Sequence, residues 1–314
     1  MEEAQQDKVR PMAMDTPPVP QQTGDTPKGF AYALTAYGLW GLLPIYLKAL
    51  GHISPFEVLA HRVVWSVPCA ALILLATRRI GDLKAAVRSP RTMGMAALTA
   101  SLITINWCTY VYAVGSGQAI EGALGYFINP LFSILLGAIV LKEKLTRTQI
   151  AAIVLVAVAV GILTWDAGRL PWISLTLTVS WGFYAFLRKT LPVGPNQGFF
   201  LEVALLSIPA VPFILWLESS GTGHFTHGTR LDTWLLASAG VATAIPLMIY
   251  ANAAKMLRLS TIAVMQYITP TIIFLIAVFV FREPMNPVKL SAFVLIWSAL
   301  ALYSYSMLRA YRAR

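Results

Sequence analysis

Four ionisable side chains lie inside apolar stretches of the sequence, where charges are costly and usually either paired or functional. Glu57, His61 and Arg62 begin one such stretch, and Glu202 lies near the start of another. Glu57 and His61 are one helical turn apart, so their side chains can pair on one face. Because imidazole titrates near physiological pH, Glu57, His61 and Arg62 are candidates for a proton or charge relay. An interfacial ion cluster whose side chains reach toward water explains the same residues equally well.

Glu202 is isolated within the run Phe199-Phe200-Leu201-Glu202-Val203. A carboxylate in such a segment needs a cation beside it or a bound proton. Arg188 and Lys189 precede the segment on the same side of the membrane and can supply the cation. Glu202 is therefore a second candidate for proton coupling.

Aromatic and amide side chains recur inside the apolar segments. Asn106 and Trp107 lie three to four residues before Tyr110, which places them on one helical face with it. Aromatic walls with a few amides suit an amphipathic small molecule, including a cation or a zwitterion. Packing between helices with interhelical hydrogen bonds is the alternative. The expected substrate cavity comprises Trp40, Asn106, Trp107, Tyr110, Tyr126, Asn129, Trp181, Tyr184, Asn252, Gln266 and Tyr267.

The composition predicts the structure that positions these residues. The 314 residues are 57% hydrophobic and only 12% charged, with a mean hydropathy of +0.66, whereas soluble proteins average about 25% charged residues. A spanning helix needs about 20 mostly apolar residues, and the sequence has ten such segments without strand-like alternation. They run at about 30–50, 57–77, 93–114, 120–141, 148–165, 171–187, 199–217, 231–253, 260–281 and 289–307. We therefore expect an all-α integral membrane protein with ten transmembrane helices.

The net charge of +10 is explained by the membrane orientation and not by nucleic-acid binding. With the N-terminus in the cytoplasm, 18 of the 24 Lys and Arg residues fall on the cytoplasmic side and 5 on the other, as the positive-inside rule requires. Both termini are then cytoplasmic. Residues 1–28 lack apolar periodicity and the layout of a signal peptide, so we expect a disordered cytoplasmic tail.

The motifs that would indicate a cofactor, a metal site or catalysis are weak or missing. Cys69 and Cys108 lie in apolar segments and form no CxxC pair, and His224 and His227 share a loop without Cys or carboxylate companions in the sequence. No GxxxxGK, HExxH or GxSxG pattern occurs. We expect no cofactor, no metal and no enzymatic activity.

The two halves of the chain repeat at an offset of 140 to 141 residues. Trp40-Gly41 recurs as Trp181-Gly182, Pro130 as Pro270, and Lys142-Glu143 as Arg282-Glu283. Each unit has five spans, an odd number, so the second unit, residues 167–314, must be inverted relative to the first, residues 29–166. Inverted repeats around a central site are typical of alternating-access transporters. Gene duplication in a membrane scaffold or sensor is the alternative.

Pro130 and Pro270 interrupt hydrogen bonding in the middle of their helices. A freed carbonyl group in lipid must face a cavity or polar neighbours, so we expect each kink near Asn129 or Gln266 in the bundle interior. The two prolines are candidate hinges for alternating access, with static kinks as the alternative.

Several runs resemble the RarD permeases of the EamA branch of the drug/metabolite transporter superfamily. They are the stretches 37–48, 57–62 and 121–130, together with Asn106-Trp107, and the resemblance covers about residues 28–308. It implies a ten-helix permease of the bacterial inner membrane, in a group whose members are named for chloramphenicol sensitivity or resistance.

We therefore predict a secondary transporter, an exporter of metabolites, amino-acid-like compounds or drugs such as chloramphenicol, by alternating access. The other classes considered are a non-transporting membrane receptor or scaffold and a membrane enzyme. The expected partners are a small-molecule substrate, the lipid bilayer, protons as coupling ion and, as one option, a second copy in a homodimer. No nucleic-acid partner is expected.

Overall fold

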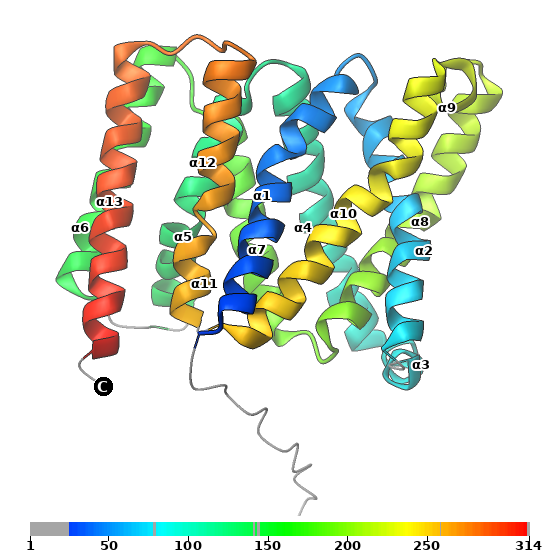
Figure 1. Ribbon diagram of the computed structural model, residues 1–314, viewed down its shortest axis with the longest axis horizontal. Coiled ribbons are helices and arrows are strands. Elements are labelled where there is room, and N and C mark those ends of the chain that lie inside the picture. Colours follow the sequence, from blue (N-terminus) through cyan, green and yellow to red (C-terminus); the bar gives the residue numbers. More distant parts are fainter. Residues whose placement is uncertain (1–24, 78–79, 141, 143–144, 258, 313–314) are drawn as a thin grey trace, which may run out of the picture.

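The protein is a bundle of helices with no strand among the residues described, which are 25–77, 80–140, 142, 145–257 and 259–312 of a computed structural model (Figure 1). The predicted disordered tail lies mostly outside these residues. Within the described residues, eight helices are long and apolar enough to cross a membrane. They are α1 (Pro27–Ala49), α2 (Pro55–Ala76), α4 (Pro90–Gly115), α5 (Ala119–Val140), α6 (Arg147–Ala167), α8 (Pro195–Ser219), α10 (Arg230–Met256) and α13 (Pro287–Arg312).

Two further segments complete the ten predicted spans. One is α7 (Trp172–Thr190), and the other is interrupted, comprising α11 (Leu259–Met265), α12 (Ile268–Leu275) and the π-helical turn η1 (Ile276–Val280). The short helices α3 (Ile80–Arg88) and α9 (His224–His227) lie at opposite ends of the bundle (Figure 1). The described ends of the chain, at α1 and α13, share the α3 end. We call the opposite end, which carries α9, the distal end.

Local sequence fixes where the helices begin. Proline occupies the first helical position of α1, α2, α4 and α8, where its missing N–H group costs nothing. Thr146 and Thr229 form capping boxes at the starts of α6 and α10, with Gln149 and Asp232 respectively. These signals explain why the observed spans begin within a few residues of the predicted ones.

The helices pack with an approximate exchange symmetry between the two halves. α6 packs on α13 at one edge of the bundle and α2 packs on α8 at the other (Figure 1). Between these edges, α1 packs on α10 and α7 packs on α4. These two contacts are equivalent, because α7 is the repeat counterpart of α1 and α4 is that of α10. The fold is therefore two inverted five-helix repeats, as the sequence predicts.

Individual contacts repeat with the same offset. A Cβ atom on Gly41 would lie 2.7 Å from Ile272 Cβ, and one on Gly182 would lie 2.3 Å from Phe132 Cδ1. Gly182 and Ile272 are the repeat partners of Gly41 and Phe132. The repeated glycine thus lets the first helix of each unit approach the fourth helix of the other.

The two mid-span prolines differ in their effect on the helix. α5 continues through Pro130, whereas its counterpart is interrupted by a turn at Gln266 and Tyr267, three to four residues before Pro270. The secondary structure at the two prolines therefore differs between the repeats, and the expected kink at Pro130 stays a prediction. Beyond the prolines the pseudo-symmetry resumes, because Lys142 and Arg282 both have left-handed backbone conformations, with φ of 55° and 54°.

Candidate functional site

Arg62 is the central charged residue of the candidate site. Its side chain is buried, and Nε donates a hydrogen bond to Thr243 Oγ1 of α10 over 2.8 Å. The guanidinium group lies above the ring of Trp107 of α4, at 4.3 Å from the ring centroid. Nη1 has no hydrogen-bond partner among the described residues. α2, α4 and α10 thus hold a buried cation that keeps a free donor.

An amide and two phenols continue this site onto α5 and α7. Asn106 is buried and donates from Nδ2 to the carbonyl oxygen of Leu177 at 3.0 Å and to Ser180 Oγ at 3.1 Å. Tyr126 donates its hydroxyl to Asn106 Oδ1 over 3.4 Å, and its ring meets Tyr110 edge-on at a centroid distance of 5.3 Å. These contacts fix the positions of the Asn106, Tyr110 and Tyr126 side chains.

Unpartnered polar atoms concentrate around this group. The phenols of Tyr126, Tyr46 and Tyr110 lie within electrostatic range of the Arg62 guanidinium, and the buried hydroxyl of Tyr110 has no partner in the described structure. The same is true of Asn129 Oδ1, on α5 one turn beyond Tyr126. Buried polar groups are nearly always hydrogen-bonded in proteins, by other residues, water or a ligand. This group, which we call the Arg62 site, is therefore chemically incomplete as it stands.

Two side chains of the Arg62 site are not among those expected from sequence. Thr243 lies in the apolar middle of α10, and Tyr46 of α1 donates its hydroxyl to the carbonyl oxygen of Leu235. A lone hydroxyl in an apolar segment is common, so no pattern singles out either residue. Only the packing of α1 and α2 against α10 reveals them.

Glu202 forms a separate ionic site on the side of the termini. Its carboxylate is buried and accepts hydrogen bonds from Arg188 Nη1 at 2.6 Å and from the Tyr184 hydroxyl at 3.2 Å. Arg188 also donates to the carbonyl oxygen of Pro195 over 2.6 Å. Arg188 is thus the cation expected beside Glu202, while the side chain of Lys189 lies outside the described part of the chain. The ring of Tyr184 packs on Trp181, which is itself exposed.

The expected pairing of Glu57 with His61 is wrong. The Glu57 carboxylate instead accepts hydrogen bonds from the backbone N–H of His224 at 2.6 Å and meets its Nδ1 at 2.9 Å. The His61 ring stacks on Phe225, with a centroid distance of 5.0 Å and an interplanar angle of 19°. The first residues of α9 therefore supply a partner to each of two side chains that helical spacing alone would pair with each other.

The remaining candidate cavity residues lie in other surroundings. Trp40 packs against Tyr37 and Tyr250, with centroid distances of 5.9 and 5.5 Å, in a cluster formed by α1, α10 and α11. Asn252 is exposed and donates to the carbonyl oxygen of Met248 in its own helix. Gln266 and Tyr267 form the turn that interrupts the ninth span, and the hydroxyl of Tyr267 is buried without a partner in the described structure. The predicted set is thus dispersed over several places, and only part of it surrounds Arg62.

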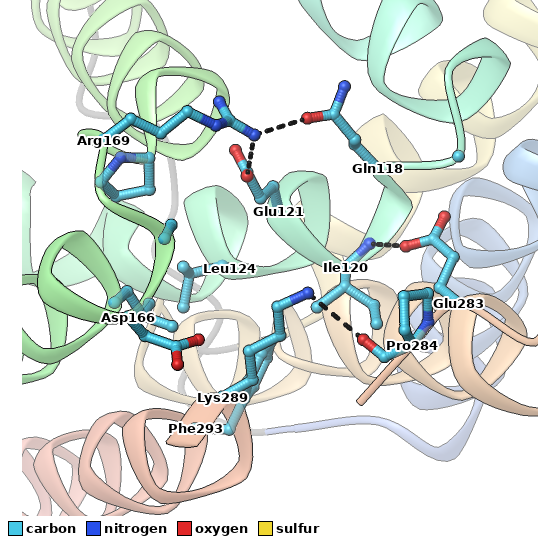
Figure 2. A pocket seen from close by; sticks show the side chains of 14 residues that line it. Gln118, Ile120, Glu121, Leu124, Asp166, Arg169, Glu283, Pro284, Lys289 and Phe293 are labelled. Atoms are coloured by element: carbon cyan, nitrogen blue, oxygen red, sulfur yellow. Dashed lines mark hydrogen bonds and ion pairs between the residues drawn. The ribbon is translucent and has the colours of Figure 1, made fainter. Parts of the chain in front are cut away.

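A cavity of about 230 Å³ opens at the distal end, between α5, α6 and the loop before α13 (Figure 2). Arg169 donates there to Gln118 at 3.1 Å and to Glu121 at 3.3 Å. Glu283 accepts the first two backbone N–H groups of α5, at 2.7 and 2.9 Å, which stabilises that helix end. No side chain from the predicted substrate set lines this cavity, so it is distinct from the Arg62 site.

Known proteins match this chain over almost its whole length. The model of the EamA-like transporter family matches twice, over residues 27–165 and 171–305. A protein named RarD from Streptomyces exfoliatus is 41% identical over 285 residues, covering 90% of each chain. A Pseudomonas aeruginosa protein named chloramphenicol-sensitive protein RarD is 29% identical, covering 91% of this chain and 96% of its own. One solved crystal structure superposes with a TM-score of 0.55 at 18% identity, covering 90% of this chain and 98% of that one, which supports the fold.

Proposed function

The chain belongs to the EamA-like transporter family, and from this premise we propose that it carries small amphipathic molecules through the Arg62 site by alternating access. Membrane transport itself follows from membership of the family and from the RarD relatives. The substrate class and the location of the binding site are our proposal. The observation that carries it is a pair of buried polar atoms without partners, Arg62 Nη1 and the Tyr110 hydroxyl, together with the unpartnered Asn129 Oδ1 one turn beyond Tyr126 on α5.

These atoms favour a substrate with a negative or strongly hydrogen-bonding group beside an apolar or aromatic body. No carboxylate forms an ion pair with Arg62 in the described part of the chain, so a ligand carboxylate would supply the missing counter-charge. The faces of Trp107 and Tyr126 suit an apolar or cationic part of the same molecule. Amino-acid-like compounds combine these features. The name of the Pseudomonas relative adds chloramphenicol as a compound to test.

Ligand-dependent thermal stabilisation of the purified protein tests this proposal. The panel contains L-amino acids, cationic metabolites and chloramphenicol, and Arg62→Met is measured beside the unsubstituted protein. A ligand present at about 100 times its Kd adds about 2.7 kcal/mol to the free energy of unfolding. We expect a zwitterionic or anionic compound to stabilise the protein and to lose this effect in Arg62→Met. Stabilisation that survives the substitution would place the binding site elsewhere.

We further propose that Glu202 couples transport to protons. Its buried carboxylate accepts hydrogen bonds from Arg188 and Tyr184, so protonation would weaken its pairing with Arg188 and loosen the contact between α7 and α8. In proteoliposomes, Glu202→Gln should abolish the dependence of net flux on a pH gradient while substrate exchange at equal pH continues. Equal loss of exchange and net flux would instead make Glu202 a structural residue.

Orientation forms part of the same proposal. The excess of Lys and Arg in the loops on the side of the termini supports a cytoplasmic location of both termini, in a bacterial inner membrane. Fusions of alkaline phosphatase and of green fluorescent protein to the C-terminus test this directly. We expect fluorescence without phosphatase activity, and the reverse result would invert the topology.

A further inference from the structure

All four histidines of the sequence lie at the distal end of the bundle. They come from the loop after α1, from α2 and from α9, and each lies close to an acidic side chain. His52 Nε2 is 3.0 Å from Asp232, His224 Nδ1 is 2.9 Å from Glu57, and His227 Nδ1 is 3.3 Å from Glu218. The fourth, His61, differs from the others because it is buried without a hydrogen bond.

His61 is only 2% exposed, and neither of its ring nitrogens has a partner among the described residues. A buried imidazole without partners is an exception that requires an explanation. The explanation lies in what surrounds it. One ligand atom of His61 and one carboxylate oxygen from each of Glu57 and Glu218 lie within 4.8 Å of one another.

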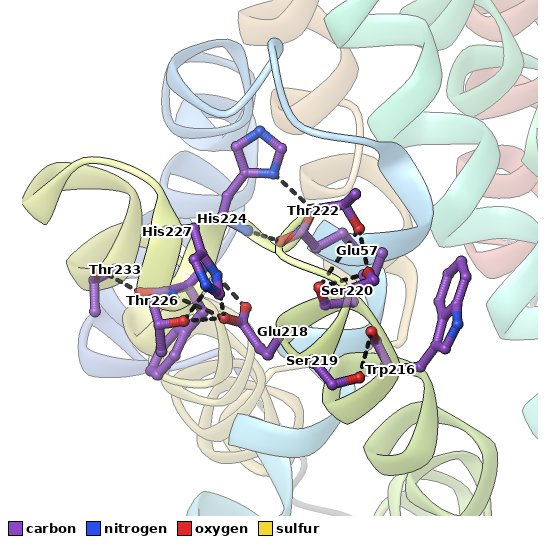
Figure 3. Close-up of polar contacts among 12 residues, drawn as sticks. Glu57, Trp216, Glu218, Ser219, Ser220, Thr222, His224, Thr226, His227 and Thr233 are labelled. Carbon is purple, nitrogen blue, oxygen red and sulfur yellow. Dashed lines mark hydrogen bonds and ion pairs between the residues drawn. The ribbon is translucent and has the colours of Figure 1, made fainter.

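The two carboxylates are already oriented by the chain that joins α8 to α10 (Figure 3). Glu57 accepts two hydrogen bonds from His224, while Glu218 accepts the backbone N–H groups of Phe225 and Thr226, each at 3.2 Å. Carboxylate oxygens have further lone pairs after these bonds are made. Both groups therefore keep the capacity to bind a cation while α9 holds them in place.

The charge of this cluster also favours a cation. Two carboxylates lie close together, and in the described structure neither Glu57 nor Glu218 forms an ion pair with a Lys or Arg. The side chain of Glu57 is 2% exposed and that of Glu218 is 17% exposed. Repulsion between two such groups in poorly solvated surroundings is relieved most simply by a positive ion between them.

We propose that Glu57, His61 and Glu218 bind a divalent transition-metal ion of the zinc class. An imidazole nitrogen with two carboxylate oxygens suits Zn²⁺, whose bonds to N and O ligands are about 2.0–2.2 Å long. Mg²⁺ and Ca²⁺ take oxygen ligands, so His61 selects against them. A small contraction of the three side chains closes the site. The bound ion would link α2 to α8 at the distal end.

Binding of Zn²⁺ to the full-length protein, purified with an affinity tag that contains no histidine, tests the proposal. Calorimetric titration should show one saturable Zn²⁺ per chain and no comparable binding of Mg²⁺. Replacing Zn²⁺ by Co²⁺ should give visible d–d absorption without the charge-transfer band of a thiolate ligand. A lack of saturable Zn²⁺ binding would overturn the proposal, as would a thiolate band.

Substitutions distinguish this site from adventitious binding by surface histidines. Removing a residue that only hydrogen-bonds to a metal ligand typically weakens metal binding about 10–100-fold. His61 and Glu218 would be ligands themselves, so His61→Gln and Glu218→Gln should each weaken Zn²⁺ binding by about 100-fold or more. Glu218 is the more exposed of the two, so Glu218→Gln keeps the test valid if His61→Gln fails to fold. His52→Gln is the matched control, because His52 lies at the same end but pairs with Asp232. Equal losses in His52→Gln and Glu218→Gln would overturn the proposal.

Discussion

Replacing Arg62 by methionine should abolish transport while leaving the fold nearly as stable as before. The structure shows what the charge contributes to folding. Nε makes one charge-assisted hydrogen bond to Thr243, which stabilises by about 1.5–3 kcal/mol, and the stack on Trp107 adds about 2 kcal/mol. Insertion of an arginine at the centre of a spanning helix costs about 2.5–3.5 kcal/mol. The cost of burying the charge offsets most of the stabilisation from the hydrogen bond and the stack. We therefore expect the free energy of unfolding of Arg62→Met to fall by only about 1–2 kcal/mol.

Ligand binding should respond far more strongly than stability. Loss of one charge-assisted hydrogen bond of about 2.7 kcal/mol weakens binding roughly 100-fold. Methionine keeps an apolar side chain beside Trp107 and removes only the interactions of the charge, including the cation–π contact. The assay pairs thermal denaturation in detergent with counterflow of the identified ligand in proteoliposomes.

Two controls make this result interpretable. Arg169→Met removes an exposed cation from the distal loop. It should leave the flux unchanged and alter the free energy of unfolding by no more than about 1 kcal/mol. Thr243→Val removes the hydroxyl that holds Nε and should lower affinity less than Arg62→Met does. Destabilisation of Arg62→Met by more than about 3 kcal/mol would refute the reasoning, because Arg62 would then be a folding residue. Normal counterflow in that variant would refute its role as a substrate anchor.

Three further outcomes follow from the packing. Gly240→Ala should destabilise the protein by about 1–3 kcal/mol, because a Cβ atom at this position would lie 2.1 Å from the backbone of Trp65. The control is Gly161→Ala, where a Cβ atom would have nothing within 4 Å, so this variant should be neutral or stabilising in thermal denaturation. Glu283→Gln should lower the free energy of unfolding by about 1–2 kcal/mol, because it weakens two hydrogen bonds at the start of α5; unchanged stability would contradict this. Pro130→Ala should slow turnover more than it weakens ligand binding if the proline is a hinge, and unchanged turnover would exclude that role.

The sequence predicts the spans well because their ends are specified locally. Apolar length, proline at the first helical turn and the capping residues of α6 and α10 all act within a few residues. The repeat is also visible, since Trp-Gly and the mid-span prolines keep one register. By contrast, no local pattern reveals that the ninth span is interrupted at Gln266 while α5 continues through Pro130. That difference depends on the helices packed around each proline.

The candidate site is only partly predictable for a similar reason. Side chains within one helix, such as Asn106 and Tyr110, can be grouped from their spacing. The contact between Glu57 and His224 joins residues 167 positions apart, and Arg62 and Thr243 are 181 apart. Helical spacing favours a local partner for Glu57, but the chain between α8 and α10 provides a better one. The metal-ligand geometry around His61 depends on that same long-range packing.

The ninth span is interrupted near Pro270 while α5 continues through Pro130, and this difference affects the resting state of the transporter. Under the proposed alternating access, strict symmetry between the repeats would give the two inverted conformations equal free energies and equal populations. An interruption confined to the ninth span removes that degeneracy, and a free-energy difference of only about 1.4 kcal/mol already gives a tenfold preference. The affinity measured from one side of the membrane is then reduced by the fraction of molecules open to that side. Affinities measured from the two sides should therefore differ even if the Arg62 site itself is identical in both states.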